Sequence, residues 1–96
     1  MKFAWDLRKE ATNIAKHGVP FSEAQQAFDD PLALVAFDEA HSPRGGHELR
    51  WWLLGKVRGR VMLVRYTHRP GGIIRIIGAG YWQMGEKYYE EKNRID

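Results

Sequence analysis

Side chains that can transfer protons and hold a phosphate gather near one predicted strand end. Arg65, Tyr66, His68 and Arg69 lie close together in the chain. Histidine is the side chain whose ordinary pKa lies near neutrality, so it can act as an acid or a base at physiological pH. Cleavage of RNA without a metal ion needs a base for the 2′-hydroxyl, an acid for the leaving oxygen and cations around the phosphate. His68 and Arg65 are therefore candidate catalytic residues, and a surface turn residue without a chemical role is the other interpretation of His68.

The centre of the chain is strongly basic. The segment from Arg44 to Arg75 contains eight arginine and lysine residues and one acidic residue, Glu48. The net charge of the whole chain is only +3, because the other segments are slightly acidic. Such a concentration of positive charge favours a phosphate-bearing partner. We take three of these side chains as RNA-binding candidates: Arg50, Lys56 and Arg69. A solvated sheet with arginines on its exposed face is the alternative interpretation.

Strand alternation predicts which of the arginines share a surface. It places Val61, Leu63, Arg65 and Thr67 on one face of a strand, and Ile73, Arg75, Ile77 and Ala79 on one face of the next. If the strand register aligns these sets, Arg65 and Arg75 lie together amid apolar neighbours. A charge in such surroundings needs a partner. RNA phosphate or an acidic segment of another protein would satisfy it, and so would an internal pair with Asp38, Glu86 or Glu90.

The sequence predicts neither a metal site nor a cofactor. There is no cysteine, and the histidines, at positions 17, 41, 47 and 68, do not have the spacing of metal ligands. The segment Gly78-Ala79-Gly80 is similar to an anion-binding turn, but two glycines also allow a helix to pack closely on a sheet. Four aromatic residues can stack on bases or belong to a core or a protein interface: Trp51, Trp52, Tyr81 and Trp82.

The patterns predict one α+β domain with the element order β-α-α-β-β-β-β-α. We expect strands over 2–5, 32–37, 49–57, 61–68 and 73–79, and helices over 7–17, 21–28 and from 81 onwards. Turns fall at Arg58-Gly59 and at Arg69-Pro70-Gly71-Gly72. Consecutive strands joined by tight turns favour an antiparallel sheet with the helices packed on one face. Residues 38–47 form the longest expected loop.

Clear signals bound the first helix. Asp6 is suited to cap its start, and Gly18 to end it in a left-handed conformation. Apolar residues at helical spacing predict its packed face: Leu7, Ala11, Ile14 and Ala15. Ser22 is the candidate cap of the second helix. No apolar stretch is long enough to cross a bilayer, and the first residues do not look like a cleavable signal, so we expect a soluble, cytoplasmic protein without membrane contact.

A set of residues spread along the chain resembles the BrnT toxin family. The set comprises Phe3, Trp5-Asp6, Lys9, Asn13, Lys16-His17-Gly18-Val19, Phe21, Glu23-Ala24, Phe28, Asp30-Pro31, His41, Arg50, Gly55 and Arg75-Ile76-Ile77. The resemblance implies a RelE-like ribonuclease fold and the toxin half of a type II toxin–antitoxin pair. It also implies neutralisation by a BrnA-like antitoxin that binds DNA and represses the shared operon.

The resemblance also points to site residues. The resemblance implies that Arg75 and Glu86 are catalytic candidates. Lys16, His17 and Arg50 also match positions of the family motif, and we place them with the RNA-binding candidates. Gly80 stands where the family typically has a second arginine. If that arginine holds the scissile phosphate in the family, this chain lacks a transition-state cation or uses Tyr81 and a relocated arginine instead.

Two functions follow from these observations. The first is a ribonuclease toxin that cleaves RNA without a metal ion, inhibits translation and is neutralised by an antitoxin laid across the basic sheet, with operator DNA bound only through that antitoxin. The second is a weak or inactive relative that binds the antitoxin and modulates operator binding, and Gly80 motivates it. Direct binding of duplex DNA is less favoured because no basic recognition helix is visible.

Overall fold

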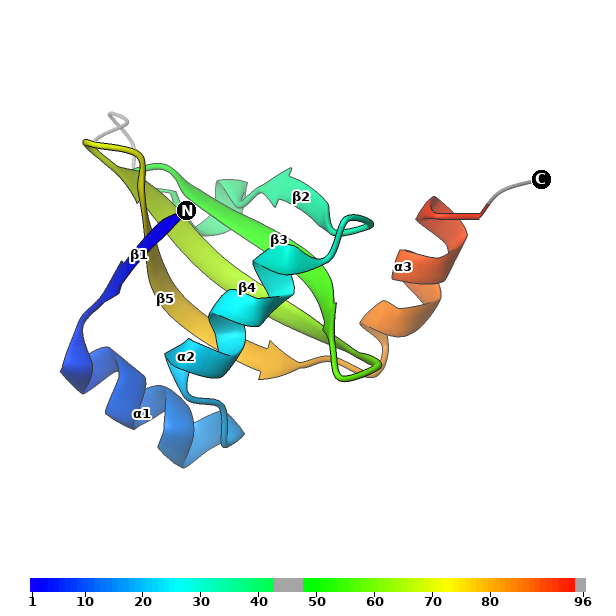
Figure 1. Ribbon diagram of the computed structural model, residues 1–96, viewed down its shortest axis with the longest axis horizontal. Coiled ribbons are helices and arrows are strands. Elements are labelled where there is room, and N and C mark those ends of the chain that lie inside the picture. The colour runs from blue at the N-terminus through cyan, green and yellow to red at the C-terminus, as the bar shows by residue number, and fades with distance from the viewer. Residues whose placement is uncertain (43–47, 95–96) are drawn as a thin grey trace.

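A twisted five-stranded sheet forms the centre of the molecule (Figure 1). The structure is a computed structural model that describes residues 1–42 and 48–94, so Arg44, His47 and the adjoining part of the expected loop lie outside the described residues. The strands are β1 (Lys2–Trp5), β2 (Leu34–Phe37), β3 (Arg50–Val57), β4 (Arg60–Arg69) and β5 (Ile73–Tyr81), and their order across the sheet is β1-β5-β4-β3-β2.

The sheet is mixed, and the expected antiparallel sheet is therefore wrong in one strand. From β2 to β5 neighbouring strands are antiparallel, but β1 pairs in parallel with β5, with Phe3 opposite Ile74. The alternation that marks a strand carries no information on its direction. The parallel pairing arises because the chain leaves β1 through two helices and returns beside it only after three antiparallel strands.

The first tight turn matches its sequence signal. Arg58 and Gly59 have φ values of 54° and 79°, the left-handed region that a two-residue hairpin of this type requires. Gly71 and Gly72 also have positive φ, at the turn that joins β4 to β5. These two turns set the hairpins that place the basic residues of β3, β4 and β5 side by side.

Helix α1 (Leu7–His17) begins and ends where the sequence predicts, but its packed face is different. The Asp6 carboxylate accepts hydrogen bonds from the Arg8 and Lys9 backbone amides, and Gly18 ends the helix with φ 70°. The four apolar residues expected to pack are all exposed, and two of them, Leu7 and Ile14, are 76% and 43% exposed. The buried residue is Asn13 instead.

Asn13 is buried because α1 lies along an edge of the sheet. Its side-chain amide donates to the Ala79 carbonyl at 2.8 Å, and its carbonyl accepts from the Ala79 amide at 3.0 Å. The short strand β1 pairs with residues 73–76 and leaves the rest of this edge of β5 open. The Asn13 side chain therefore satisfies the backbone amide and carbonyl of Ala79, as the backbone of a neighbouring strand would. This contact does not require an apolar helix face.

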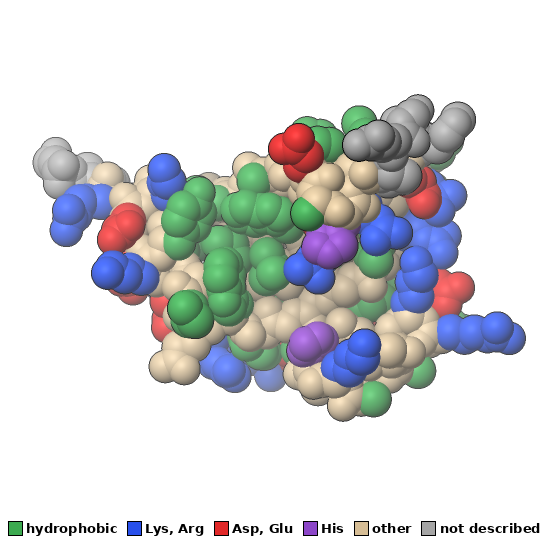
Figure 2. All heavy atoms as spheres, turned by 180° about the vertical axis from the view of Figure 1, so that it is seen from behind, with side chains coloured by type: hydrophobic (Ala, Val, Ile, Leu, Met, Phe, Trp, Pro, Cys, Tyr) green, Lys and Arg blue, Asp and Glu red, His purple; other side chains and the backbone are tan. Residues whose placement is uncertain are grey.

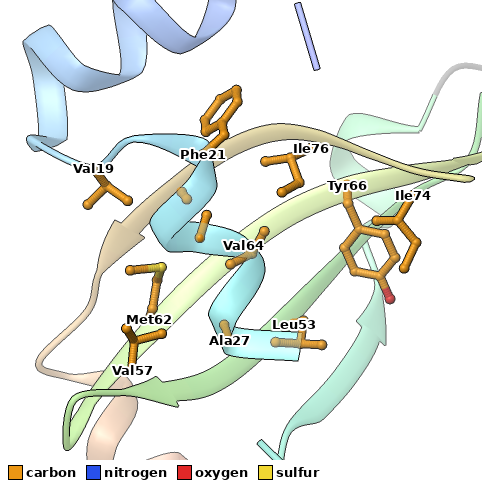
Figure 3. Close-up of a cluster of buried hydrophobic side chains, with 12 residues drawn as sticks. Val19, Phe21, Ala27, Leu53, Val57, Met62, Val64, Tyr66, Ile74 and Ile76 are labelled. Atoms are coloured by element: carbon orange, nitrogen blue, oxygen red, sulfur yellow. The ribbon is translucent and has the colours of Figure 1, made fainter. Parts of the chain in front are cut away.

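The second helical segment covers one face of the sheet and forms the main core (Figure 3). It consists of α2 (Phe21–Ala24) and the 3₁₀ turn η1 (Gln25–Asp29). Phe21, Ala24 and Ala27 pack against Met62, Val64 and Ile76 of the sheet. Ser22 is not the cap, because the Phe21 amide instead donates to the Glu10 carboxylate of α1 at 2.8 Å.

Helix α3 (Gly85–Lys92) packs on the opposite face, so the expectation that all helices share one face is wrong. Its Tyr89 is buried with Leu54 and Val61, which point away from the main core. The Tyr89 hydroxyl donates to the Asp30 carboxylate at 2.5 Å. One turn of the chain after β5 is enough to carry α3 around the end of the sheet. We call the part of this face that α3 leaves uncovered the open face.

Candidate functional site

Three arginines lie on the open face, on neighbouring strands. Arg50 is opposite Thr67, and Thr67 is opposite Arg75, so these residues form one row across β3, β4 and β5. Arg65 lies in the next row, two positions from Thr67 on β4. Arg65 and Arg75 therefore share a face, as alternation predicts. Ala79 does not join them, because Ile77 has no partner in β4 and the shift in register turns Ala79 towards the main core.

These arginines have different surroundings. Arg65 Nε lies 3.8 Å from an Asp38 carboxylate oxygen, and the guanidinium remains half exposed. Of the internal partners that the sequence offered, Asp38 is thus the one that the structure provides. Within residues 1–42 and 48–94, no carboxylate lies within ion-pair distance of Arg75. The Arg50 Nε is buried, without a hydrogen-bond partner in the same described part.

His17 and Arg65 line the same hollow beside this row. This central cavity has a volume of about 240 Å³ and is lined by Asn13, His17, Leu63, Arg65, Ala79, Gly80, Tyr81 and Trp82. Gly80 forms its wall against the imidazole, since a Cβ at that position would lie 3.4 Å from His17 Cγ and Nδ1. An imidazole and a guanidinium that face one hollow can together move a proton and stabilise negative charge.

A second hollow runs along α1 and is basic. This α1 groove, of about 320 Å³, is lined by Arg8, Lys9, Thr12, Asn13, Lys16, His17 and Ile77. It shares Asn13 and His17 with the central cavity, so the two are adjacent. The groove contains no acidic side chain among its lining residues. Its charge suits the sugar–phosphate backbone of a nucleic acid.

A third hollow lies on the other side of Arg65 and is largely apolar. This aromatic pocket, of about 400 Å³, is lined by Asp38, Trp52, Leu63, Arg65, Trp82 and Tyr88. Leu63, Arg65 and Trp82 also line the central cavity, so the central cavity lies between the α1 groove and the aromatic pocket and adjoins both. Figure 2 shows the corresponding surface, where hydrophobic side chains cluster beside histidine, lysine and arginine side chains.

The structure does not bring His68 to these hollows. Its ring contacts the rings of Tyr66 and Trp51, with centroids 5.5 and 6.5 Å away, and both of these pack with the main core. His68 therefore lies on the face that carries α2, opposite to Arg65 and Arg75. His68 is three positions from Arg65 along β4, and residues an odd number of positions apart in a strand point to opposite faces.

Tyr81 lines the central cavity, but its hydroxyl group is engaged elsewhere. The hydroxyl donates to the Glu23 carboxylate of α2 at 2.9 Å, and the Arg60 guanidinium lies 4.0 Å from the ring centre. Burial, together with the Glu23 carboxylate, raises the pKa of Tyr81 above its ordinary value. The hydroxyl is thus held in its neutral form on the far side of the sheet from Arg65.

The remaining candidates lie outside the three hollows. Glu86, in the first turn of α3, lines a separate cavity of about 290 Å³ with Arg60 and Tyr81. The Lys56 ammonium lies over the Tyr89 ring at 5.3 Å. Arg69 forms an ion pair with Glu48. Lys16 and His17, by contrast, both line the α1 groove, and Arg50 belongs to the arginine row.

Sequence reasoning missed the positions that shape the site. Asn13 was only a motif residue, although a polar residue amid helical apolar spacing is a signal that the buried side is polar. Asp38 was considered only as a partner of the arginines, and its contact with His41 was not expected: its carboxylate accepts a hydrogen bond from the His41 ring at 3.0 Å. Among the described residues there is no cluster of histidine and acidic side chains that could hold a metal ion, nor a helix long and apolar enough to cross a membrane.

Comparisons with known proteins identify relatives of the whole arrangement. The family model described as "Ribonuclease toxin, BrnT, of type II toxin-antitoxin system" matches residues 5–86. A crystal structure of the Brucella abortus ribonuclease toxin BrnT is similar to this one, with 26% sequence identity and a TM-score of 0.67, over 85% of this chain and 96% of that chain. No curated protein matches the sequence. The chain therefore belongs to the BrnT family of ribonuclease toxins of type II toxin–antitoxin systems.

Proposed function

We propose that this protein is a toxin that cleaves RNA without a metal ion, through a RelE-like fold, and so inhibits translation in the cytoplasm. The observation that carries the proposal is the central cavity, where His17 and Arg65 face one hollow between a basic groove and an aromatic pocket. The family membership supports ribonuclease chemistry, and the cavity supplies groups suited to it.

In the proposed reaction, the ribose 2′-oxygen attacks the adjacent phosphorus. The His17 ring accepts the proton of the 2′-hydroxyl as the new oxygen–phosphorus bond forms. The bond from phosphorus to the 5′-oxygen breaks, and the protonated ring or solvent returns a proton to that oxygen, which leaves a 2′,3′-cyclic phosphate and a 5′-hydroxyl. Arg65 stabilises the additional negative charge on the phosphate, and Lys16 holds the flanking backbone.

This assignment replaces part of the site proposed from sequence alone. His17 takes the acid–base role for which His68 was the candidate, because His68 lies on the opposite face from Arg65. Tyr81, the candidate to compensate for the missing arginine, has its hydroxyl bound to Glu23 and takes no part. Arg75 and Arg50 stay as cations on the same face, where they can hold phosphates beyond the cleaved bond. Glu86, Lys56 and Arg69 have no role in the proposed chemistry.

A cleavage assay tests the proposal. Purified protein is incubated with total RNA in EDTA, as wild type, His17→Ala, Arg65→Ala and Arg75→Ala, with Arg94→Ala as an exposed arginine control. We expect His17→Ala and Arg65→Ala each to lose about 100-fold or more of the rate. The cleavage rate of Arg75→Ala should fall by a smaller factor, and that of Arg94→Ala should equal the wild-type rate.

His68→Ala separates the two possible histidines in the same assay. We expect it to cleave like wild type if it folds normally by circular dichroism. Loss of cleavage in His68→Ala with full activity in His17→Ala would refute the assignment of the central cavity. Cleavage that disappears in EDTA and returns with a divalent cation would refute the metal-independent mechanism.

One observation favours a second function. Gly80 replaces the arginine expected from the family, and Arg65 is paired with Asp38, so the site has fewer free cations than the resemblance implies. The alternative is a weak or inactive toxin that binds a BrnA-like DNA-binding antitoxin and modulates its hold on operator DNA. Expression without antitoxin distinguishes the two, because an active toxin arrests growth and Arg65→Ala relieves the arrest, whereas a binding module is harmless in both forms.

A further inference from the structure

We propose that the aromatic pocket binds an unpaired base of the RNA, next to the phosphate at the central cavity. The inference rests on the proposed function and adds to it a substrate class, single-stranded RNA with a base free to stack. The three hollows share lining residues, so one nucleotide can place its phosphate by His17 and Arg65 and its base against Trp52 and Trp82.

The walls of the pocket are suited to a flat ring. The Trp52 and Tyr88 rings lie 6.5 Å apart at 64°, and Leu63 lines the same hollow. Trp82 and Tyr88 are 41% and 40% exposed, although large aromatic side chains are usually buried in a folded domain. Stacking of bases on exposed aromatic rings is the common way in which proteins recognise single-stranded RNA.

The backbone of α3 holds the Trp82 ring in position. A Cβ at Gly85 would lie 2.5 Å from Trp82 Cε3, so the ring packs directly on the helix start and any larger residue would displace it. Gly85 has no left-handed φ, and the tryptophan contact is therefore the reason for the glycine. A ring fixed in this way loses little freedom when a base stacks on it.

Charge favours a nucleotide over an apolar protein side chain as the occupant. Arg65 lines both the aromatic pocket and the central cavity, and the central cavity adjoins the basic α1 groove at Asn13 and His17. An apolar side chain of another protein would leave these cations unused, whereas a nucleotide brings an anionic phosphate with its base. Asp38 also lines the pocket, but its carboxylate is buried and is already engaged by the His41 ring and by Arg65.

Binding of non-cleavable oligonucleotides tests the inference. Two hexanucleotides with 2′-O-methyl riboses are compared by fluorescence anisotropy, one with bases and one abasic throughout, so that length and charge are equal. We expect wild type to bind the first more tightly. Trp82→Ala and Tyr88→Ala should each lose about tenfold of the affinity for the base-bearing strand and leave the abasic strand unaffected.

Matched controls keep the result interpretable. Met84→Ala removes a neighbouring side chain that is 80% exposed and lines none of the three hollows, and it should bind like wild type. Gly85→Ala should weaken base-dependent binding as Trp82→Ala does, although it removes no aromatic ring. Thermal unfolding of each variant shows whether a loss reflects misfolding, and Tyr88→Ala serves as the second variant if Trp82→Ala is unstable.

Three outcomes would overturn the inference. Equal affinity of wild type for both strands would mean that only backbone charge is recognised. Variants that lose antitoxin binding but keep base-dependent RNA binding would assign the pocket to the protein partner. A wild-type dimer that Trp82→Ala dissociates, with RNA binding intact, would assign it to a second copy of the chain.

Failure of the inference differs from failure of the proposed function. The same protein preparation is assayed for cleavage of total RNA. Cleavage together with base-independent binding would refute only the stacking pocket. The absence of both cleavage and binding, with either strand, would refute the ribonuclease proposal and the inference together.

Discussion

A single buried amide joins α1 to the sheet and thereby positions the histidine four residues later. Asn13 makes two hydrogen bonds to Ala79 and a third to the Val19 carbonyl. Removal of the amide leaves these buried backbone groups unpaired, so Asn13→Ala should lower the free energy of unfolding by about 3 kcal/mol. Urea denaturation measures this, with the exposed neighbour Thr12→Ala as the control. Equal stability of the two variants would contradict the role of Asn13.

Gly80 stands where the resemblance implies an arginine, and a side chain there would reach His17. A Cβ at Gly80 would lie 3.4 Å from the His17 ring, which is an ordinary contact distance. Gly80→Val adds atoms beyond this contact and should therefore move the imidazole and lower the cleavage rate about tenfold, with a smaller effect on stability. Gly80→Ala is the matched control and should cleave normally. A full rate in Gly80→Val would show that the position of His17 is not critical.

At the scale of elements, α3 is held to the sheet by a buried tyrosine whose ionisation opposes folding. Burial, with the Asp30 carboxylate, raises the pKa of Tyr89 to about 12, from 10.0 in the unfolded chain. The contribution to stability is therefore complete below pH 10 and is lost as the pH rises from 10 to 12, because only the unfolded chain releases the proton. The loss corresponds to about 3 kcal/mol.

Denaturation between pH 9 and pH 12 tests this ionisation. The pKa values of Tyr66 and Tyr81 are also raised by burial, so wild type should lose stability from these residues too. We expect Tyr89→Phe to have a lower free energy of unfolding than wild type at pH 9. Between pH 10 and pH 12, however, its free energy of unfolding should fall by less than that of wild type. Parallel curves for the two proteins would contradict the coupling of Tyr89 ionisation to folding.

At the scale of the whole molecule, the α1 groove and the open face concentrate positive charge along one path. RNA affinity should therefore fall with salt, with a slope of about −0.7 per phosphate contact in a plot of log affinity against log salt. Lys9→Ala, in the α1 groove, should reduce the magnitude of this slope by about 0.7. Lys87→Ala, which lies on α3 outside the three hollows, should leave it unchanged. Equal slopes for both variants would refute the path along α1.

The predictions that depended on neighbouring residues were the accurate ones. The Asp6 cap and the Gly18 end of α1 are confirmed, as is the turn at Arg58-Gly59. Those that depended on distant contacts failed more often. The apolar stripe of α1 is exposed because Asn13 docks the helix on a strand edge, and Ser22 does not cap α2 because Glu10 from another helix does.

The sequence by itself determined where α1 begins and ends, where the hairpin turns fall, the basic character of the central strands and the family, because each depends on residue types at short spacing. The end of β5 was predicted at Ala79, but the strand continues to Tyr81 and α3 begins only at Gly85. Strand alternation also indicates that His68 and Arg65 lie on opposite faces of β4, but only the tertiary structure decided that His17, from α1, shares a cavity with Arg65. That outcome depends on an unpaired residue in β5 and on hydrogen bonds between Asn13 and Ala79, 66 positions apart. Contacts over such separations form only when the whole chain packs, and no local pattern records them.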